Sequence, residues 1–306
     1  MKAVVKMLGL ILLYVTAVLP HPVLRSVARA SGWLIWLHNG RFRQITVRNL
    51  EICFPEMSED ARTCLARQSL REFSLSVLEL GRTWLRAPEY LLRRVTSVVG
   101  EDNLRAAVAG GNGAVILLPH LGNWELVNPF LAKRYPITSL YREPKLTMFG
   151  NLIRHARQRT GAVLVPTGTT GIRALLKALR SGQSVLILPD QVPRPPLGMF
   201  APFFGEPTLT MTLATNLIHR THAKAVCAYC KRLPGGQYEL VFRAVDEKIY
   251  DRDSTTALAA LNRSIEHCVL ECREQYQWEY KRYKIMPGLK RRNYYSAVND
   301  NSSRVK

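Results

Sequence analysis

The chain has 306 residues, 47% of them hydrophobic and 22% charged, which is the composition of an ordinary globular protein with room for a large core. Its 43 Lys and Arg residues exceed its 23 Asp and Glu residues and give a formal net charge of +20, which favours acidic partners. No zinc-finger spacing, basic region before heptads or aromatic-rich RNA-binding segment occurs, so we expect a lipid or an acidic carrier protein and no nucleic acid.

The N-terminus has the pattern of a membrane attachment. An apolar run over residues 7–19 follows two lysines and ends at Pro20, and it is shorter than the ~20 residues that a helix needs to cross a bilayer. It is predicted to be an anchor, with a signal peptide as the alternative. Residues 23–37 repeat apolar side chains at helical spacing, with arginines among them and Trp33 and Trp36 near the end. Residues 1–40 are therefore predicted to form an anchor and an interfacial helix, unless that helix only packs on the soluble domain.

The following segments predict a helical hairpin and then an α/β domain. A helix is expected over residues 58–85, because apolar residues recur there at alternating spacings of three and four. The face predicted to be buried consists of Leu70, Phe73, Val77, Leu80 and Trp84. Further on, apolar runs of strand length over residues 114–119, 137–142, 162–166 and 184–189 alternate with helical patterns. This alternation predicts a mostly parallel central sheet flanked by helices.

The C-terminal part adds a strand pair, a helix and a tail. Strands are predicted over residues 223–233 and 238–245, and the turn between them contains Pro234, Gly235 and Gly236. A final helix is predicted over residues 255–274. We therefore assign residues 41–290 to one α/β domain and residues 291–306 to a disordered basic tail.

A histidine and a glutamate follow the first strand of this predicted sheet. Ligands collect beyond the carboxyl ends of parallel strands, and there the sequence places His120, with Glu125 five residues later at the start of a helix. We expect Glu125 to accept a hydrogen bond from Nδ1 of His120 and to fix its tautomer, so that Nε2 can take a proton from a substrate hydroxyl. On spacing alone, a structural histidine with a surface glutamate is an equal alternative.

Several segments resemble one protein family. The segment PHLGNWE resembles the HxxxxE or HxxxxD motif of glycerolipid acyltransferases, and its GNWE ending is similar to the lipid A lauroyl and myristoyl acyltransferases of the lysophospholipid acyltransferase superfamily. Further matching blocks follow in the same order: TVRNLEICFP, Tyr141-Arg142, Asp190-Gln191 with PFFGEPTLT, and EQYQWEYKRYK. The resemblance extends from about residue 40 to about residue 285.

The resemblance implies transfer of a fatty acyl chain from a thioester on acyl carrier protein, or on coenzyme A, to a hydroxyl of a lipid A precursor. His120 and Glu125 are the implied catalytic residues, the acyl thioester is the co-substrate, and no further cofactor is expected. The implied location is the cytoplasmic face of the bacterial inner membrane. The seven histidines show no paired spacing for a metal, and no serine or cysteine lies in a GxSxG elbow. The basic surplus suits an acidic carrier, a phosphorylated acceptor and an anionic membrane surface.

Five polar residues near the predicted strand ends are expected to bind substrate: Asn123, Arg142, Arg159, Asp190 and Gln191. Arg142 ends the second strand and is a candidate for bidentate phosphate binding, with a plain surface arginine as the alternative. Arg159 lies on the helix that follows. Asp190 and Gln191 directly follow the predicted strand over residues 184–189, at the carboxyl edge of the sheet. For Asp190 we prefer a structural pairing with an arginine to a role as catalytic acid.

Phe203 and Phe204 are predicted to form the floor of an acyl pocket, with core packing as the alternative. The loop between Gln191 and Phe203 is rich in proline and apolar residues, whereas relatives typically have a more polar loop. The resemblance therefore does not determine which lipid is the acceptor. A lysophospholipid, an aminolipid or another glycolipid is the alternative acceptor. A thioesterase in which His120 activates water and a membrane-associated binding protein without catalysis are the alternatives of other classes.

Overall fold

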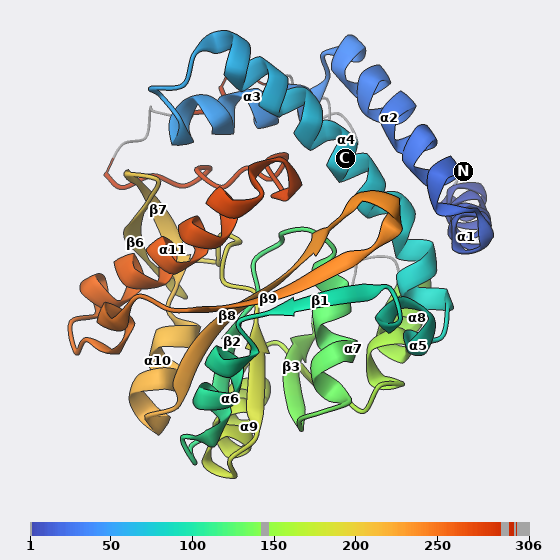
Figure 1. The fold of residues 1–306 in the computed structure, drawn as a ribbon. Helices are drawn as coiled ribbons and strands as arrows, with labels where there is room; N and C mark the ends of the chain where they lie inside the picture. The colour runs from blue at the N-terminus through green and yellow to red at the C-terminus, as the bar shows by residue number, and fades with distance from the viewer. Residues whose placement is uncertain (1, 142–146, 289–293, 297, 299–306) are drawn as a thin grey trace.

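The computed structural model describes residues 2–141, 147–288, 294–296 and 298. A seven-stranded sheet lies at its centre, with the strand order β1-β9-β8-β2-β5-β3-β4 (Figure 1). The strands are β1 (Val95–Val99), β2 (Ala114–Leu117), β3 (Ile137–Tyr141), β4 (Val163–Pro166), β5 (Ser184–Ile187), β8 (Lys224–Arg232) and β9 (Tyr238–Ala244). Neighbouring strands are parallel except β8 and β9. The predicted mostly parallel α/β fold is therefore confirmed.

The central strands are apolar on both sides because helices cover both faces of the sheet. In β2, Val115 and Leu117 belong to the core on one face, whereas Ala114 and Ile116 belong to the core on the other. Successive side chains of a strand point to opposite faces, so a strand buried on both faces is a continuous apolar run. The first face packs against α9 (Thr169–Arg180), α10 (Leu213–Thr221) and α11 (Ser254–Glu271), and the second against α6 (Glu101–Ala109) and α7 (Val127–Ala132).

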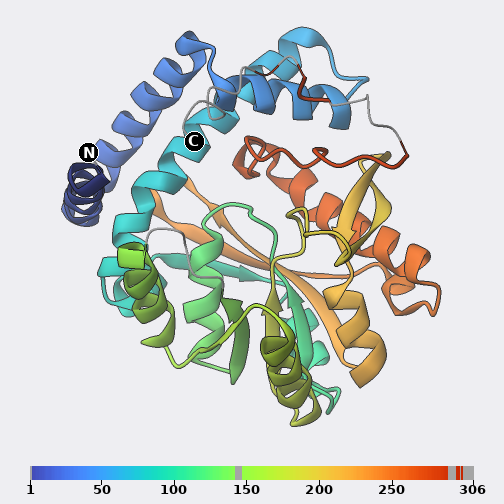
Figure 2. The same ribbon diagram turned by 180° about the vertical axis from the view of Figure 1, so that it is seen from behind.

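The described chain begins with the helices α1 (Lys2–Val18), α2 (His21–His38), α3 (Arg41–Cys53) and α4 (Glu59–Leu85). The N-cap of α4 is Ser58, whose hydroxyl accepts a hydrogen bond from the amide of Ala61. Helix α4 lies between the α1–α2 pair and the sheet, as the two opposite views show (Figure 1, Figure 2). Gly81 permits this packing, since a Cβ atom there would lie 2.2 Å from the carbonyl oxygen of Leu13 on α1. Within the described residues, no helix combines the length and the apolar character needed to span a membrane.

Three elements were not expected from the sequence. Helix α3 begins directly after the predicted interfacial helix, and its buried side chains include Ile45, Leu50 and Cys53 at helical spacing. Strand β1 pairs with β9 at the edge of the sheet. The supposed loop between Gln191 and Phe203 enters the antiparallel hairpin of β6 (Gly198–Phe203) and β7 (Glu206–Met211). Its two-residue turn ends on Gly205, whose φ of 80° favours glycine.

Two further helices and four 3-10 turns complete the described elements. They are α5 (Pro88–Leu92), α8 (Thr147–Gln158) and the 3-10 turns η1 (Trp124–Leu126), η2 (Pro234–Gly236), η3 (Glu247–Tyr250) and η4 (Arg273–Gln275). In the predicted disordered tail, Tyr295 and Val298 are buried in the core. The Tyr295 hydroxyl donates to Oδ1 of Asn49 at 2.5 Å and accepts from the amide of Tyr283 at 3.1 Å. This part of the tail is therefore packed, because its aromatic ring and its hydroxyl both find partners.

Candidate active site

The site lies at the carboxyl ends of the two neighbouring strands β2 and β5. Leu117 pairs with Ile187 in the parallel register, and the amide of Leu118 still donates to the carbonyl of Ile187 at 2.8 Å. His120 and Asp190 each follow the last residue of their strand by three positions. Equal offsets from paired strand ends bring the two side chains together.

Asp190 holds His120 through two hydrogen bonds. Its Oδ1 lies 2.8 Å from Nδ1 of the imidazole, and its Oδ2 accepts from the backbone amide of His120, also at 2.8 Å. The amide nitrogen Nε2 of Gln191 lies 3.1 Å from Nε2 of His120. With the proton on Nδ1, the lone pair on Nε2 accepts this amide hydrogen bond, so the three side chains together favour the tautomer of a general base.

Electrostatics keep Asp190 ionised although its side chain is only 2% exposed. Burial by itself raises the pKa of this carboxyl, but the charge and the hydrogen bonds of His120, with the more distant Arg282, outweigh it and hold the pKa below its usual value. An anionic Asp190 can stabilise the imidazolium that forms when His120 takes up a proton. The expected pairing of Asp190 with an arginine is thus replaced by a pairing with the histidine.

The predicted contact between Glu125 and His120 is not formed. Glu125 lies on η1 and accepts two hydrogen bonds from Arg157 of α8, at 3.1 Å from Nε and 2.6 Å from Nη2. Burial lowers the pKa of Arg157, but the Glu125 carboxylate outweighs this and raises it overall. Arg157 also lies over the Trp124 ring, 5.4 Å from its centroid, and that ring lies 5.0 Å from the His120 ring. Glu125 therefore supports the pocket wall next to His120. Asp190 makes the contact with Nδ1 of His120 that we predicted for Glu125.

Residues 118–126, which follow β2 and carry His120, are called the histidine loop. A buried network that the sequence did not suggest lies next to this loop and is centred on Glu79 of α4. Its Oε2 accepts from Nδ2 of Asn123 at 3.1 Å and from Nε of Arg232 at 2.7 Å, and its Oε1 accepts from the Tyr238 hydroxyl at 2.9 Å. Asn123 is thus oriented by a carboxylate within the protein. The signal in the sequence was the position of Glu79 between Leu78 and Leu80 in the apolar part of α4, where a charged residue needs a partner.

Gly122 brings the histidine loop against strand β8. It has a φ of 62°, and a Cβ atom there would lie 2.0 Å from the carbonyl oxygen of Cys230. The adjacent amide of Asn123 donates to this carbonyl at 2.8 Å, and the amide of Gly122 donates to the carbonyl of Gln275 at 3.0 Å. The loop is therefore fixed from both sides, by Cys230 of β8 and by Gln275 of η4.

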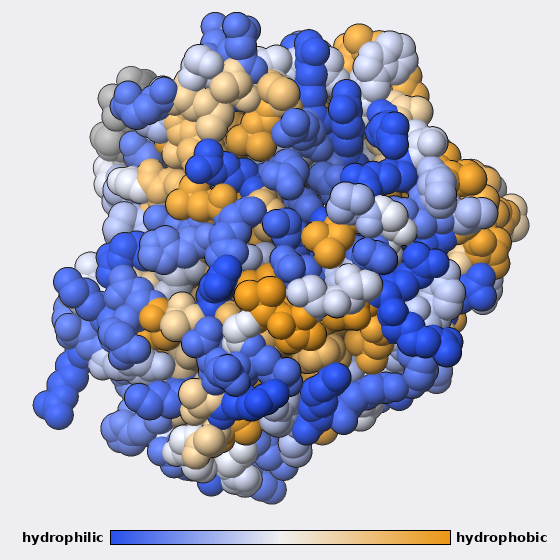
Figure 3. All heavy atoms as spheres, in the orientation of Figure 1, coloured by the Kyte–Doolittle hydropathy of each residue, from blue (hydrophilic) through white to orange (hydrophobic). Residues whose placement is uncertain are grey.

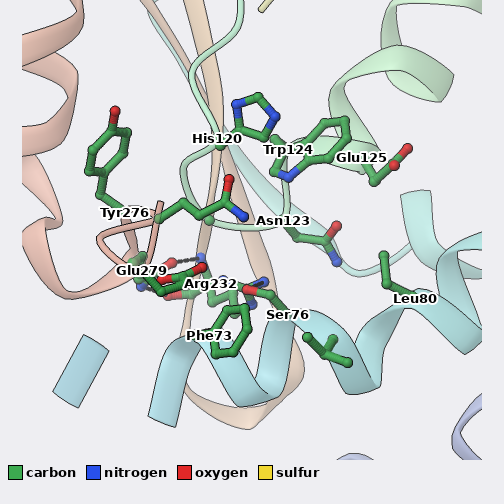
Figure 4. A pocket seen from close by; sticks show the side chains of 14 residues that line it. Phe73, Ser76, Leu80, His120, Asn123, Trp124, Glu125, Arg232, Tyr276 and Glu279 are labelled. Atoms are coloured by element: carbon green, nitrogen blue, oxygen red, sulfur yellow. Dashed lines mark hydrogen bonds between the residues drawn. The ribbon is translucent and has the colours of Figure 1, made fainter. Parts of the chain in front are cut away.

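A pocket with about 630 Å³ of empty space opens beside His120. Figure 4 shows side chains from α4, from the histidine loop and from the segment after η4 around it. Its lining residues are Phe73, Ser76, Val77, Leu80, His120, Gly122, Asn123, Trp124, Glu125, Arg232, Gln275, Tyr276, Gln277 and Glu279. Three apolar side chains that we predicted to face the core, Phe73, Val77 and Leu80, line this pocket instead.

The other predicted substrate-binding residues lie elsewhere. Arg159 donates through Nη2 to the backbone carbonyls of Thr83 and Arg86 at the end of α4, and it does not line the pocket of His120. Phe203 and Phe204 do not line it either. Phe203 is 1% exposed and belongs to the core, and the Phe204 ring packs edge-on against Phe54, 5.2 Å between centroids. Arg142 lies outside the described residues.

The carboxyl edge of the parallel sheet, where α/β enzymes bind their ligands, thus carries a histidine held by a buried carboxylate beside a partly apolar pocket. The sequence model of the family described as "Bacterial lipid A biosynthesis acyltransferase" matches residues 1–285. The chain belongs to this family and is a lipid A late acyltransferase.

Three similar proteins come from Escherichia coli (strain K12). The "Lipid A biosynthesis lauroyltransferase" is 27% identical over 282 residues, which cover 92% of this chain and 91% of that protein. The "Lipid A biosynthesis palmitoleoyltransferase" is 27% identical over 281 residues, 91% of this chain and 90% of that protein. The "Lipid A biosynthesis myristoyltransferase" is 23% identical over 273 residues, 87% of this chain and 82% of that protein. Their names differ in the acyl chain, so similarity to them does not select one chain length.

Proposed function

We propose that this acyltransferase moves a fatty acyl group from a thioester on acyl carrier protein, or on coenzyme A, to a hydroxyl of a lipid A precursor, with His120 as the general base. The observation that carries the proposal is the Asp190–His120–Gln191 arrangement, in which Nδ1 of His120 faces the Asp190 carboxylate, Nε2 lies 3.1 Å from the Gln191 amide nitrogen, and His120 lines the pocket. The acceptor hydroxyl takes the place of the Gln191 amide as the group that donates to Nε2.

The proposed step forms an ester and breaks a thioester. Nε2 of His120 takes the hydroxyl proton while the acceptor oxygen attacks the carbonyl carbon of the thioester. The tetrahedral intermediate collapses, the C–S bond breaks, and the imidazolium returns the proton to the leaving sulfur. Asp190 stabilises the imidazolium between these transfers. Five of the six cysteines are buried, which supports direct transfer without an acyl-cysteine intermediate.

The apolar wall of the pocket supports a lipid substrate. Phe73, Val77 and Leu80 lie on α4, and Trp124 faces the same space from the histidine loop (Figure 4). An acyl chain placed there exchanges water for apolar contacts, which is favourable by about 25 cal/mol for each Å² that is buried. We therefore infer that the acyl chain lies along α4, in place of the predicted floor at Phe203 and Phe204.

A second cavity supports an anionic acceptor. It holds about 1090 Å³ of empty space between α2, α4 and the end of β8, and it shares Arg232 and Gln275 with the pocket of His120. Its basic side chains are Arg25, Arg29, Arg71, Lys231 and Arg232, and its acidic ones are Glu72 and Glu274. Converging guanidinium groups bind phosphate well, so we infer that a phosphate of the acceptor occupies this cavity while its hydroxyl reaches His120.

The double variant Arg25→Ala with Arg71→Ala tests this inference. We expect KM for a phosphorylated acceptor to rise about 10-fold or more, because a hydrogen bond between charged groups is worth about 1.5–3 kcal/mol. We expect kcat to be unchanged, since neither arginine lines the pocket of His120. Steady-state kinetics measure both. The control Arg105→Ala removes an exposed arginine of α6 and leaves KM as it is; an equal rise in that variant, or with a dephosphorylated acceptor, contradicts the inference.

We further propose that the enzyme attaches to the cytoplasmic face of the bacterial inner membrane through α1 and α2. Apolar side chains are exposed on both helices, and Figure 3 shows them gathered on the side of the molecule where α1 lies. They are Met7, Leu8, Ile11, Leu12, Tyr14, Val15, Val18, Val23, Val27, Trp33, Leu34 and Leu37. An apolar surface of this extent, next to a basic cavity, suits the interface of an anionic membrane.

Co-sedimentation with vesicles that contain anionic phospholipid tests the attachment. The double variant Leu12→Glu with Leu34→Glu is expected to bind at least about 10-fold more weakly, because burial of one leucine is worth about 1.5–3 kcal/mol. Leu197→Glu is the matched control, since Leu197 is 62% exposed in the segment before β6. Undiminished binding of the double variant, or an equal loss in the control, would be evidence against attachment through α1 and α2.

The acceptor is tested by mass spectrometry of lipids from a strain that lacks this gene. We expect lipid A molecules that lack one acyl chain, and we expect the wild-type gene, but not a gene encoding His120→Ala, to restore that chain. Unchanged lipid A together with loss of a phospholipid, an aminolipid or another glycolipid would assign the enzyme to a different acceptor.

A further inference from the structure

The segment after η4 carries an acidic residue, Glu279, into the pocket of His120. The segment is hydrogen-bonded to the histidine loop, with the amide of Gln277 donating to the carbonyl of His120 at 3.2 Å. On both sides of Glu279 the backbone is anchored by Asn49 of α3, whose Nδ2 donates to the carbonyls of Trp278 at 2.6 Å and Tyr280 at 2.9 Å. Glu279 therefore has a fixed position relative to the reacting histidine.

The carboxyl of Glu279 is buried, and no ion pair joins it to another residue in the described part of the chain. Its residue is 7% exposed, and its Oε2 has no hydrogen-bond partner among the described residues. Arg232 lines the same pocket, but its Nε and Nη2 are bound to Glu79 and Ser76, and its Nη1 lies 3.7 Å from Glu72. A buried polar oxygen without a partner costs free energy, which a bound ligand can recover by forming the missing hydrogen bond.

The environment keeps this carboxyl protonated at neutral pH. Burial raises the pKa of Glu279 to about 8, against smaller opposing effects of its own backbone amide and of the Gln277 side chain. Below that pH the group is neutral and offers an O–H donor, whereas above it the group is a carboxylate that can only accept. A neutral carboxyl in a partly apolar pocket is suited to an uncharged polar group of the ligand.

We propose that Glu279 is a specificity-determining residue whose buried, unpartnered carboxyl hydrogen-bonds an uncharged amide or hydroxyl of the bound substrate. The identity of these substrates, an acyl thioester and a lipid A precursor, rests on the proposed function. Figure 4 shows Glu279 apart from His120, on the side of the pocket where Phe73 and Arg232 lie. Glu279 therefore contacts a part of the substrate that is remote from the reacting bond. Two substrates carry such groups: the pantetheine arm of the donor contains amides, and the lipid A precursor contains amides and hydroxyls.

Equilibrium binding to the full chain separates these two sources without requiring turnover. The first probe is an acyl-pantetheine thioether, which cannot be cleaved, and the second is the lipid A precursor. Each is measured with wild type, Glu279→Gln and Glu279→Leu at pH 7 and pH 9. Glutamine keeps the size and an N–H donor but does not ionise, whereas leucine keeps the volume and removes the hydrogen bond.

We expect one of the two probes to bind Glu279→Leu at least about 10-fold more weakly at pH 7, the loss of one hydrogen bond to a buried group. Because the raised pKa means that the proton is lost as the pH rises through about 8, wild type should lose affinity for the same probe at pH 9, whereas Glu279→Gln should not. The probe that responds identifies the donor or the acceptor as the ligand.

Other titratable groups at the pocket cannot imitate this alkaline loss. Arg232 has a raised pKa and stays charged, and Tyr276 has a pKa well above its usual value of 10 because it is buried, so it stays neutral. Glu125 is ion-paired with Arg157 and Glu79 with Arg232. Equal affinities of both probes for all three proteins at both pH values would overturn the role of Glu279, while acyl transfer that depends on His120 would still stand.

Discussion

Replacing His120 by alanine is expected to lower kcat for acyl transfer by about 10²–10⁴-fold, the usual contribution of a general base. The acceptor hydroxyl then keeps its proton, so the thioester is attacked by a neutral alcohol, which is a weaker nucleophile than an alkoxide-like oxygen. Transfer of a labelled acyl group to the lipid A precursor, followed over time, measures the effect. KM should change little, because His120 is one of fourteen residues that line the pocket.

The folded state of this variant needs a control, since Asp190 would lose its imidazole partner inside the core. The hydrogen bond from the backbone amide of residue 120 to Oδ2 of Asp190 remains and keeps the carboxylate partly satisfied. Circular dichroism and the melting temperature report whether the fold persists. A folded His120→Ala protein with more than half of the wild-type rate would contradict the role of His120 as base.

Asp190→Asn and Glu125→Gln should affect different properties of the enzyme. An asparagine at position 190 can offer its N–H to Nδ1, which reverses the tautomer and removes the charge that stabilises the imidazolium, so we expect kcat to fall about 10³–10⁴-fold. Glu125→Gln breaks a buried pair with Arg157, and we expect the free energy of unfolding to fall by about 3–5 kcal/mol. Its kcat should fall less than that of Asp190→Asn.

Urea unfolding and steady-state kinetics of the two variants decide between the carboxylates. The opposite ranking, with Glu125→Gln nearly inactive and Asp190→Asn nearly normal, would restore the prediction that Glu125 orients the histidine. Lysine at position 157 offers a matched comparison, because Arg157→Lys keeps the charge but loses the two-point hydrogen bonding to Glu125. It should destabilise the protein without a large change in kcat.

The sequence predicted which strand ends carry polar residues but not which strand ends meet. His120 and Asp190 were both placed at the carboxyl edge, yet β2 and β5 are neighbours because of the strand order, and local periodicity contains no information on order. Five residues of separation made Glu125 the obvious partner, whereas the partner in space lies seventy residues away. The hydrogen-bond network around Glu79 was not predicted for the same reason, since Glu79 and Arg232 are far apart in the sequence.

The regular elements were more predictable than the surfaces they present. The limits of α4 and the β8–β9 pair follow from periodicity and capping, and they agree with the structure within a few residues. The apolar face of α4 was recognised, but periodicity cannot tell a face that packs in the core from one that lines a pocket. Phe203 and Phe204 pack edge-on against each other, with ring centroids 4.9 Å apart, and buried aromatic residues have the same sequence pattern whether they contact a ligand or each other.

The measurement that tests the account most directly follows the acyl group of a labelled acyl carrier protein thioester, incubated with purified wild-type enzyme in the presence and absence of lipid A precursor. The account predicts that label moves to the precursor, that His120→Ala abolishes this transfer, and that the donor remains largely intact when no acceptor is present. Release of free fatty acid without acceptor, as fast as transfer with it, would show that His120 activates water and would contradict the proposal of an acyltransferase mechanism.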